Sequence, residues 1–160
     1  MRSEIKLISG NKWVGSYRGM VDSKNLPHGR GQIKYQNGSR FDGFFFKGFK
    51  HGSGIMKFSN GNKFTGEYKM DKRQGYGEFF YAETDENYVG YWLNDLRHGR
   101  GEYRFKNGSI FRGIFKNDLK HGVGKKISKS VVYTGQWKNG KKHGIFKYKQ
   151  LNTGKIKTKS

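Results

Sequence analysis

The stretch FDGFFFKGFKHGSG, residues 41–54, carries the clearest structural signal in the chain. Its aromatic residues alternate with glycines, although glycine weakens a strand and aromatic rings ordinarily pack in a core. Side chains alternate between the two faces of a strand, so Phe41, Gly43 and Phe45 share one face. We therefore predict a hairpin whose glycines make room for the rings of neighbouring hairpins.

The composition of the 160-residue chain points to an unusual core. Glycine occurs 25 times and proline once, and aromatic residues make up 16% of the chain although all hydrophobic residues together reach only 32%. Such a chain has too few aliphatic residues for a thick globular core. Disordered segments are poor in aromatic residues, so disorder is not expected either. Stability should come from flat aromatic contacts and backbone pairing.

Several classes of protein are excluded or disfavoured. The chain has no cysteine, which excludes disulfides, thiol catalysis and cysteine-based zinc sites. No apolar run has the length needed to span a bilayer. The first residues, MRSEIKLISGNKW, contain no long apolar segment typical of a secretory signal. We expect an intracellular protein.

Two short elements recur six times along the chain. The first reads WVGSY (13–17), FDGFF (41–45), FTGEY (64–68), YVGYW (88–92), FRGIF (111–115) and YTGQW (133–137). The second reads HGRG (28–31), HGSG (51–54), QGYG (74–77), HGRG (98–101), HGVG (121–124) and HGIF (143–146). The glycines of the two elements lie nine residues apart in five copies and 14 apart in the first, so a longer loop is expected in residues 19–27.

This pattern resembles the MORN repeat, whose unit reads roughly Tyr-x-Gly-x-Trp-x-x-Gly-x-x-x-Gly-x-Gly. The resemblance covers about residues 13–148. Some copies depart from it, with Gln74 in place of histidine, Phe146 in place of glycine, and Lys126 and Ser128 in place of apolar residues. The resemblance implies a non-enzymatic interaction module, because proteins of this family act as scaffolds in cytoskeletal, ciliary and membrane-associated assemblies.

Each copy is predicted to form a two-stranded hairpin. In HGSGIMKF, residues 51–58, alternate side chains are glycine or apolar and would share one face. The pairs Asn37-Gly38, Asn60-Gly61 and Asn107-Gly108 are predicted to be type I′ turns between copies, and residues 116–122 form a turn within a copy. The predicted fold class is all-β: an elongated single-layer antiparallel β-meander of stacked hairpins, with about 14 strands.

The whole chain, residues 1–160, is interpreted as one repeat array. Its copies begin near residues 13, 41, 64, 88, 111 and 133, and residues 1–12 and 146–160 are predicted to be capping half-repeats. One glycine in each copy is predicted to be structural, lying beneath an aromatic ring. These glycines are Gly15, Gly43, Gly66, Gly90, Gly113 and Gly135.

No catalytic, cofactor-binding or metal-binding residues are predicted. Five histidines occupy one position of the repeat, and copies roughly 10 Å apart could not share a zinc ion. We interpret them as structural turn residues: His28, His51, His98, His121 and His143. The Gly-x-Gly elements precede strands, whereas nucleotide loops precede helices. The carboxylates are scattered, and their one cluster, residues 83–86, is predicted to form an acidic loop.

The leading hypothesis for function is a scaffold that binds an acidic or amphipathic segment of a partner protein. A curled sheet would have a groove on its aromatic face, and aromatic anchors ringed by cations are typical of binding hot spots. The predicted lining is Trp13, Tyr17, Phe41, Phe45, Phe64, Tyr68, Tyr88, Trp92, Phe111, Phe115, Tyr133 and Trp137.

The charge of the chain supports two further hypotheses. Its net charge is +21, and residues 119–160 hold 12 lysines and no acidic residue. The predicted basic surface is Lys138, Lys141, Lys142, Lys147, Lys149, Lys155, Lys157 and Lys159. It could bind anionic membrane lipids, or with the aromatic residues it could bind nucleic acid, which we rank last. The last strands could pair between chains, so a homodimer is possible. The expected location is cytoplasmic, cytoskeletal or ciliary, or at the membrane periphery.

Overall fold

The computed structural model describes residues 2–9 and 12–159, and the side chains of Lys6 and of residues 14–159. All of its regular secondary structure is β-strand, and the strands pair antiparallel with their neighbours in sequence. The prediction of an all-β, single-layer meander is confirmed. Among the described residues no helix has the length and apolar character to cross a bilayer.

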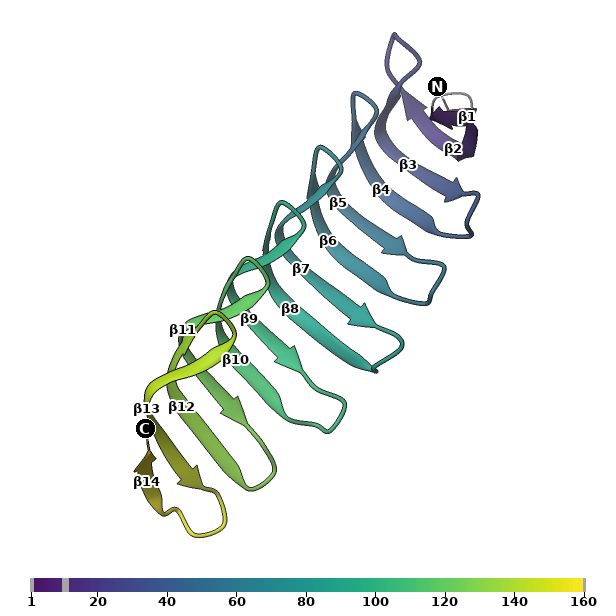
Figure 1. Ribbon diagram of the computed structural model, residues 1–160. Helices are drawn as coiled ribbons and strands as arrows, with labels where there is room; N and C mark the ends of the chain where they lie inside the picture. The colour runs from purple at the N-terminus through teal and green to yellow at the C-terminus, as the bar shows by residue number, and fades with distance from the viewer. Residues whose placement is uncertain (1, 10–11, 160) are drawn as a thin grey trace. The chain divides into compact units, whose positions relative to one another are not determined.

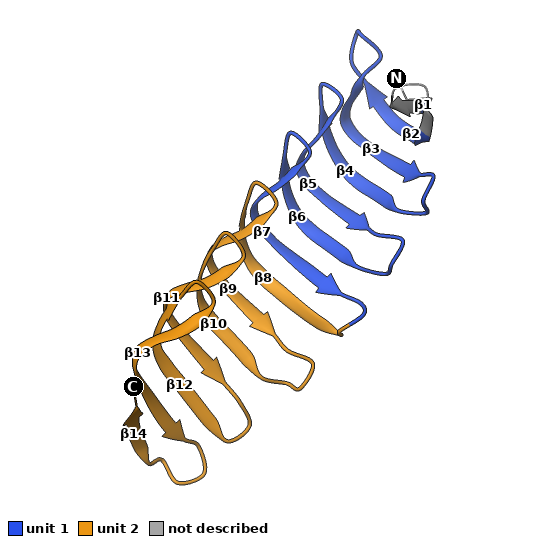
Figure 2. Cartoon of the chain, in the orientation of Figure 1, with its two compact units in different colours: residues 1–83 blue, residues 84–160 orange. Residues whose placement is uncertain are grey.

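The chain divides into two compact units, residues 1–83 and residues 84–160 (Figure 2). Within each unit the strands follow one another in chain order, and the hairpins curl back over one face of the sheet (Figure 1). The first unit contains β1 (Arg2–Ser9), β2 (Lys12–Val21), β3 (Pro27–Tyr35), β4 (Arg40–Phe46), β5 (Phe49–Lys57), β6 (Lys63–Lys69) and β7 (Lys72–Tyr81). The second contains β8 (Glu86–Leu93), β9 (Leu96–Arg104), β10 (Ile110–Lys116), β11 (Leu119–Ile127), β12 (Val131–Lys138), β13 (Lys141–Gln150) and β14 (Ile156–Lys159).

A row of glycines crosses each unit at right angles to the strands. Gly43 of β4 stands opposite Gly31 of β3 on one side and Gly54 of β5 on the other. In the second unit Gly113 of β10 likewise stands between Gly101 and Gly124. We call these residues the glycine row, and the side of the sheet to which their missing side chains would point is called the ring face.

Aromatic rings lie directly on the glycine row. A Cβ added at Gly43 would lie 2.7 Å from Cζ of Phe41, and one at Gly77 would lie 2.6 Å from Cζ of Phe64. In the second unit a Cβ added at Gly124 would lie 2.7 Å from Cζ of Phe111. No side chain could occupy these places. The predicted contact between ring and glycine is therefore present, but the ring comes mainly from the same copy. At Gly124 a ring of the next copy also contributes, because an added Cβ would lie 2.9 Å from Cδ1 of Trp137.

Neighbouring copies are joined by edge-to-face contacts between rings. In the first unit, ring centroids lie 5.1 Å apart for Tyr17 and Phe45 and for Phe41 and Tyr68. In the second unit a continuous series of ring contacts links five aromatic residues, with successive centroids 5.0–5.6 Å apart: Tyr88, Phe115, Phe111, Trp137 and Phe146. Such pairs contribute about 0.5–1.5 kcal/mol each beyond the burial of their area. The hydrophobic core consists of this series of packed rings.

The turns differ from the prediction in their type. In copies two to six both central residues of the turn within the copy have positive φ, as in Asn117-Asp118 at 48° and 68°, so these are the type I′ turns. At Asn37-Gly38 only the glycine has positive φ, at 87°. The Asn37 side chain instead accepts the N–H of Ser39 at 3.0 Å, and this Asx turn fixes a longer loop that ends on the left-handed glycine. The assignment of type I′ turns to the Asn-Gly pairs was wrong.

The His-Gly pair forms a bulge in the second strand of each hairpin. Gly43 pairs with Gly54, whereas Phe45 pairs with Lys50, so β5 carries two residues more than β4 at this point. Gly52 has φ of 72°, which a residue with a side chain rarely adopts. Bulges bend a strand and increase its twist. The bulge therefore helps to curl each hairpin over the rings.

The first copy begins at Tyr17 and not near residue 13. The Tyr17 ring covers Gly31, and Gly19 stands opposite Gly31 in the glycine row. Gly15 pairs with Tyr35, and a Cβ there would lie 3.0 Å from the Cα of Tyr35. Gly15 is thus confined by the neighbouring backbone and not by a ring. The sequence WVGSY fits the motif, but the strand pairing shows that Tyr17-Arg18-Gly19 has the structural role of the motif in this copy.

The last copy also has a ring on a glycine, but here the second strand of the hairpin supplies the ring and the first strand supplies the glycine. Phe146 of β13 stands where the other copies have a glycine, and a Cβ added at Gly135 would lie 2.7 Å from its ring. The ring also packs edge-to-face on Trp137, with centroids 5.6 Å apart. Beyond it, β14 pairs with β13, and at the other end β1 pairs with β2. Strands thus lie at both predicted caps.

Gly66→Val tests the role of the glycine row. The new side chain would meet the Cα of Gly77 at 2.6 Å and the Phe64 ring at 2.7 Å. We expect a loss of about 1–3 kcal/mol or more of unfolding free energy, measured by urea denaturation. Thr65→Val, at the adjacent exposed position, is the matched control and should change stability little. Equal stability of both variants would contradict the packing described here.

Candidate functional site

Most of the predicted groove residues are packed inside the protein. Ten of the twelve rings are buried, Tyr133 is half-buried, and the side chain of Trp13 lies outside the described residues. The structure therefore assigns these ten rings to the core. The surface above these rings is formed by the side chains that cover them.

A row of cations covers the rings. One basic residue precedes the His-Gly or Gln-Gly pair of copies two to six, and strand register places it opposite the second aromatic residue of the hairpin, on the ring face. These cations are Lys50, Arg73, Arg97, Lys120 and Lys142. In the second unit they lie 4.2–5.8 Å from the ring centroids beneath them. Sequence reasoning missed this row, although five basic residues at one repeat position were visible.

Turn aspartates neutralise some of these cations. Arg97 Nε donates to Asp118 Oδ1 at 2.9 Å, and Arg97 Nη2 donates to the Asp118 carbonyl at 3.0 Å. In the first unit Lys50 Nζ lies 3.8 Å from Asp71 Oδ1. Each aspartate is the second residue of a type I′ turn, which brings it back to the preceding hairpin.

Lys120 has the same position without an acidic partner. The corresponding turn residue is Gly140, whose N–H donates to the Lys120 carbonyl at 2.9 Å. Among the described residues no carboxylate lies within ion-pair distance of Lys120, Lys126 or Lys142. Burial lowers the pKa of Lys120, and the nearby charges of Lys126 and Arg97 lower it further.

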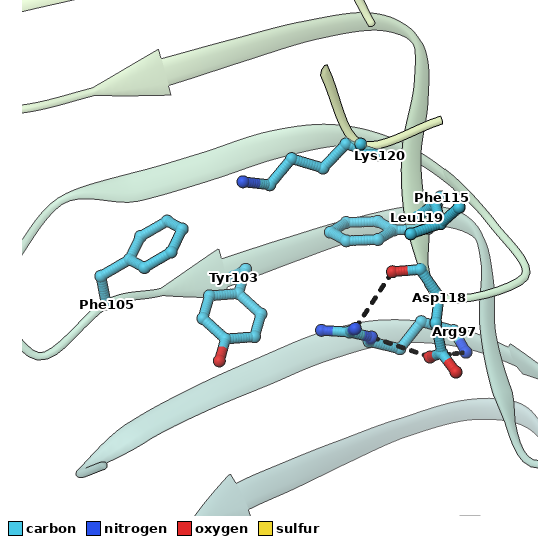
Figure 3. Close-up of a pocket in the computed structure, with 8 residues that line it drawn as sticks. Arg97, Tyr103, Phe105, Phe115, Asp118, Leu119 and Lys120 are labelled. Atoms are coloured by element: carbon cyan, nitrogen blue, oxygen red, sulfur yellow. Dashed lines mark hydrogen bonds and ion pairs between the residues drawn. The ribbon is translucent and has the colours of Figure 1, made fainter. Parts of the chain in front are cut away.

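Lys120 and Arg97 border a hollow of about 240 Å³ on the ring face of the second unit (Figure 3). In Figure 3 the Lys120 ammonium extends toward Phe105, whereas Arg97 is turned toward Asp118. Lys120 Nζ lies 5.1 Å from the Phe105 centroid, and Lys126 Nζ lies 4.9 Å from it. Aromatic walls with unneutralised cations suit an anionic group. The full lining is Arg97, Tyr103, Phe105, Phe115, Asp118, Leu119, Lys120 and Gly140.

The eight lysines of the predicted basic surface are all exposed. They do not share one face. Lys142 lies over the rings of Tyr133 and Tyr148, and Lys157 stands opposite Tyr148, so both belong to the ring face. Lys147 and Lys149 flank Tyr148 in β13, and their side chains therefore point to the opposite side.

The predicted structural histidines lie at the bulges. His51 packs on Phe46 with ring centroids 5.6 Å apart, and its buried Nδ1 has no hydrogen-bond partner among the residues that the structure describes. The part of the chain that the structure describes contains no group of three or more His, Cys, Asp or Glu side chains able to hold a metal ion.

The repeat geometry agrees with a family comparison. The model of the MORN repeat matches residues 23–40, 41–63, 64–85, 88–110, 111–130 and 133–145. This chain belongs to the MORN repeat family. The predicted resemblance is confirmed, and the second to sixth segments begin at the same residues as the predicted copies. The first matched segment begins after Gly19, within the loop of the first copy.

This MORN repeat protein also has a similar solved structure. It is the TCP domain of SAS-4 (dCPAP) of Drosophila melanogaster, in complex with a proline-rich motif of Ana2 (dSTIL). The two are 14% identical, the TM-score is 0.34, and the match covers 99% of this chain and 89% of that chain. No curated protein sequence matches the chain.

Lys120→Met tests the burial of an unpaired cation. Because its folded-state pKa lies below the ordinary 10.5, the charged form costs stability at neutral pH. That cost fades as the pH rises through the lowered pKa toward 10.5. Methionine keeps an apolar stem on the rings, so we expect a melting temperature equal to or above that of the wild type at pH 7, with the difference shrinking near pH 10.5. A clear loss of stability at pH 7 would show instead that the ammonium group stabilises the fold.

Proposed function

We propose that this MORN repeat protein is a protein-binding scaffold that holds an acidic segment of a partner on the ring face of its second unit. MORN repeats are non-enzymatic binding modules, which supports a scaffold in general terms. The observation that carries the specific proposal is a set of three cations that lie over aromatic rings and have no acidic partner among the described residues: Lys120, Lys126 and Lys142.

The spacing of these cations suits an extended chain. Arg97, Lys120 and Lys142 occupy alternate strands, so they recur roughly every 10 Å across the sheet. An extended polypeptide covers that distance in about three residues. A segment with an acidic residue at every third position, running across the strands, would meet successive cations. Complementary charge of this kind contributes specificity and a fast association rate.

A peripheral membrane role is the second candidate. All eight lysines of the basic surface are exposed, and each lysine near an anionic bilayer contributes about 1 kcal/mol. Their division between the two sides of the sheet favours the protein-binding proposal, because a flat bilayer meets only one side at a time. Dimer formation and the cytoskeletal, ciliary or membrane location stay predictions.

The proposal is tested with a labelled peptide that carries glutamate at every third position. The ring-face variant replaces Lys120, Lys126 and Lys142 with glutamine, and the matched control replaces Lys125, Lys138 and Lys147 on the opposite side. Both lose three charges, so a general charge effect would weaken them equally. We expect the ring-face variant to raise the dissociation constant at least about tenfold and the control to change it much less.

Two results would contradict the proposal. One is absence of saturable peptide binding to the wild type at low salt, where electrostatic attraction is strongest. The other is saturable binding to phosphoinositide vesicles that the opposite-side variant loses and the ring-face variant keeps, which would support the membrane role instead. A pull-down with both variants, read by mass spectrometry, then identifies natural partners.

A further inference from the structure

Turns within copies contact one residue of the preceding hairpin, and the charges of the two contacting residues usually balance. Gly48 donates its N–H to the carbonyl of Pro27, and neither residue is charged. In the Lys50–Asp71 and Arg97–Asp118 contacts the cation has its carboxylate. The contact of Gly140 with Lys120 lacks this balance, because the cation is present and the carboxylate is absent.

A second cation makes this imbalance larger. Lys126 occupies the position that holds the aromatic Tyr103 in the preceding copy, and its ammonium group shares the Phe105 ring with that of Lys120. Both side chains are half-buried. Arg97 is already neutralised by Asp118, so two positive charges at one ring have no partner among the described residues. Partly buried like charges repel with little screening by salt.

We propose that Lys120 and Lys126 bind a phosphate monoester carried by the partner segment. This inference rests on the proposed function, since it names the chemistry of one group on the bound segment. A phosphate monoester carries −1.5 to −2 charges near pH 7, which balances two ammonium groups, whereas a carboxylate would balance only one. Its oxygens can accept hydrogen bonds from both lysines.

A phosphorylated protein segment fits this place better than a lipid headgroup does. The two lysines are half-buried over the rings of the curled sheet, beside a hollow lined by Tyr103, Phe105 and Phe115. The phosphate of an extended chain can reach into such a hollow with its neighbouring residues on the rings. The lysines that a bilayer could reach most readily, such as Lys147 and Lys149, are exposed on the opposite side.

The test restores the missing carboxylate. Gly140→Asp should give Lys120 the partner that Asp71 gives Lys50, and thereby compete with the phosphate. Gly140 has φ of 81°, close to the 69° of Asp71, and a Cβ there would be 3.7 Å from its nearest neighbour, so the backbone accepts the change. Gly140→Asn is the matched control, with the same shape and no charge. The probes are three forms of one peptide with acidic residues at every third position and Ser, phosphoserine or Glu at its centre.

We expect the full-length wild type to bind the phosphoserine form at least about tenfold more tightly than the serine form, with the glutamate form between them. Gly140→Asp should abolish this gain, and Gly140→Asn should keep it. Equal binding of all three forms by the wild type would overturn the phosphate site and leave the proposed function intact, whereas no binding of any form would contradict the proposed function itself. A gain that survives in Gly140→Asp would place the phosphate elsewhere. Binding to phosphoinositide vesicles that Gly140→Asp removes, with no gain for the phosphopeptide, would assign the site to a lipid.

Discussion

The contact between an aromatic ring and the backbone of a glycine is the constraint on which the rest of the structure depends. A single sheet has no second layer against which to bury its side chains. Phe41 is buried because its ring lies on Gly43 and Gly54, and the ring of Phe111 is buried in the same way on Gly113 and Gly124. Any Cβ in the glycine row would lift a ring and expose it. The edge-to-face contacts between copies exist only because the rings lie this low on the sheet.

The same constraint determines which residues are left for binding. The rings on the glycine row are buried, so the surface over them consists of the cations placed opposite the second aromatic residue of each hairpin. Turn aspartates such as Asp71 and Asp118 balance these cations where the turn provides one. Gly140 does not, and the imbalance at Lys120 and Lys126 is the basis of the anionic site that we propose on the second unit.

The sequence predicted the fold well because strand alternation and repeat spacing are local properties. The hairpins and the placing of rings on glycines follow from residues close together in the chain, but the sequence did not show that a ring such as Phe41 lies on the glycines of its own copy. The first copy was misplaced because WVGSY and Tyr17-Arg18-Gly19 both fit the motif, and only the pairing of Gly19 with Gly31 distinguishes them. The candidate site was harder to predict. Whether a ring is exposed depends on how strongly the sheet curls, which the repeat pattern does not specify. The missing partner of Lys120 depends on Gly140, a turn residue that lies twenty residues further along the chain and contacts Lys120 only in the folded protein.

The most direct test of the ring-over-glycine core is the proton NMR spectrum of the glycine row. Protons that lie close together in space give nuclear Overhauser contacts, and the ends of the Phe41, Phe64 and Phe111 rings lie against these glycines. We expect nuclear Overhauser contacts from the Hα protons of Gly54, Gly77 and Gly124 to the ring protons of Phe41, Phe64 and Phe111, and no such contacts from the turn glycines Gly38 and Gly108. Absence of these contacts in the folded protein would contradict the account.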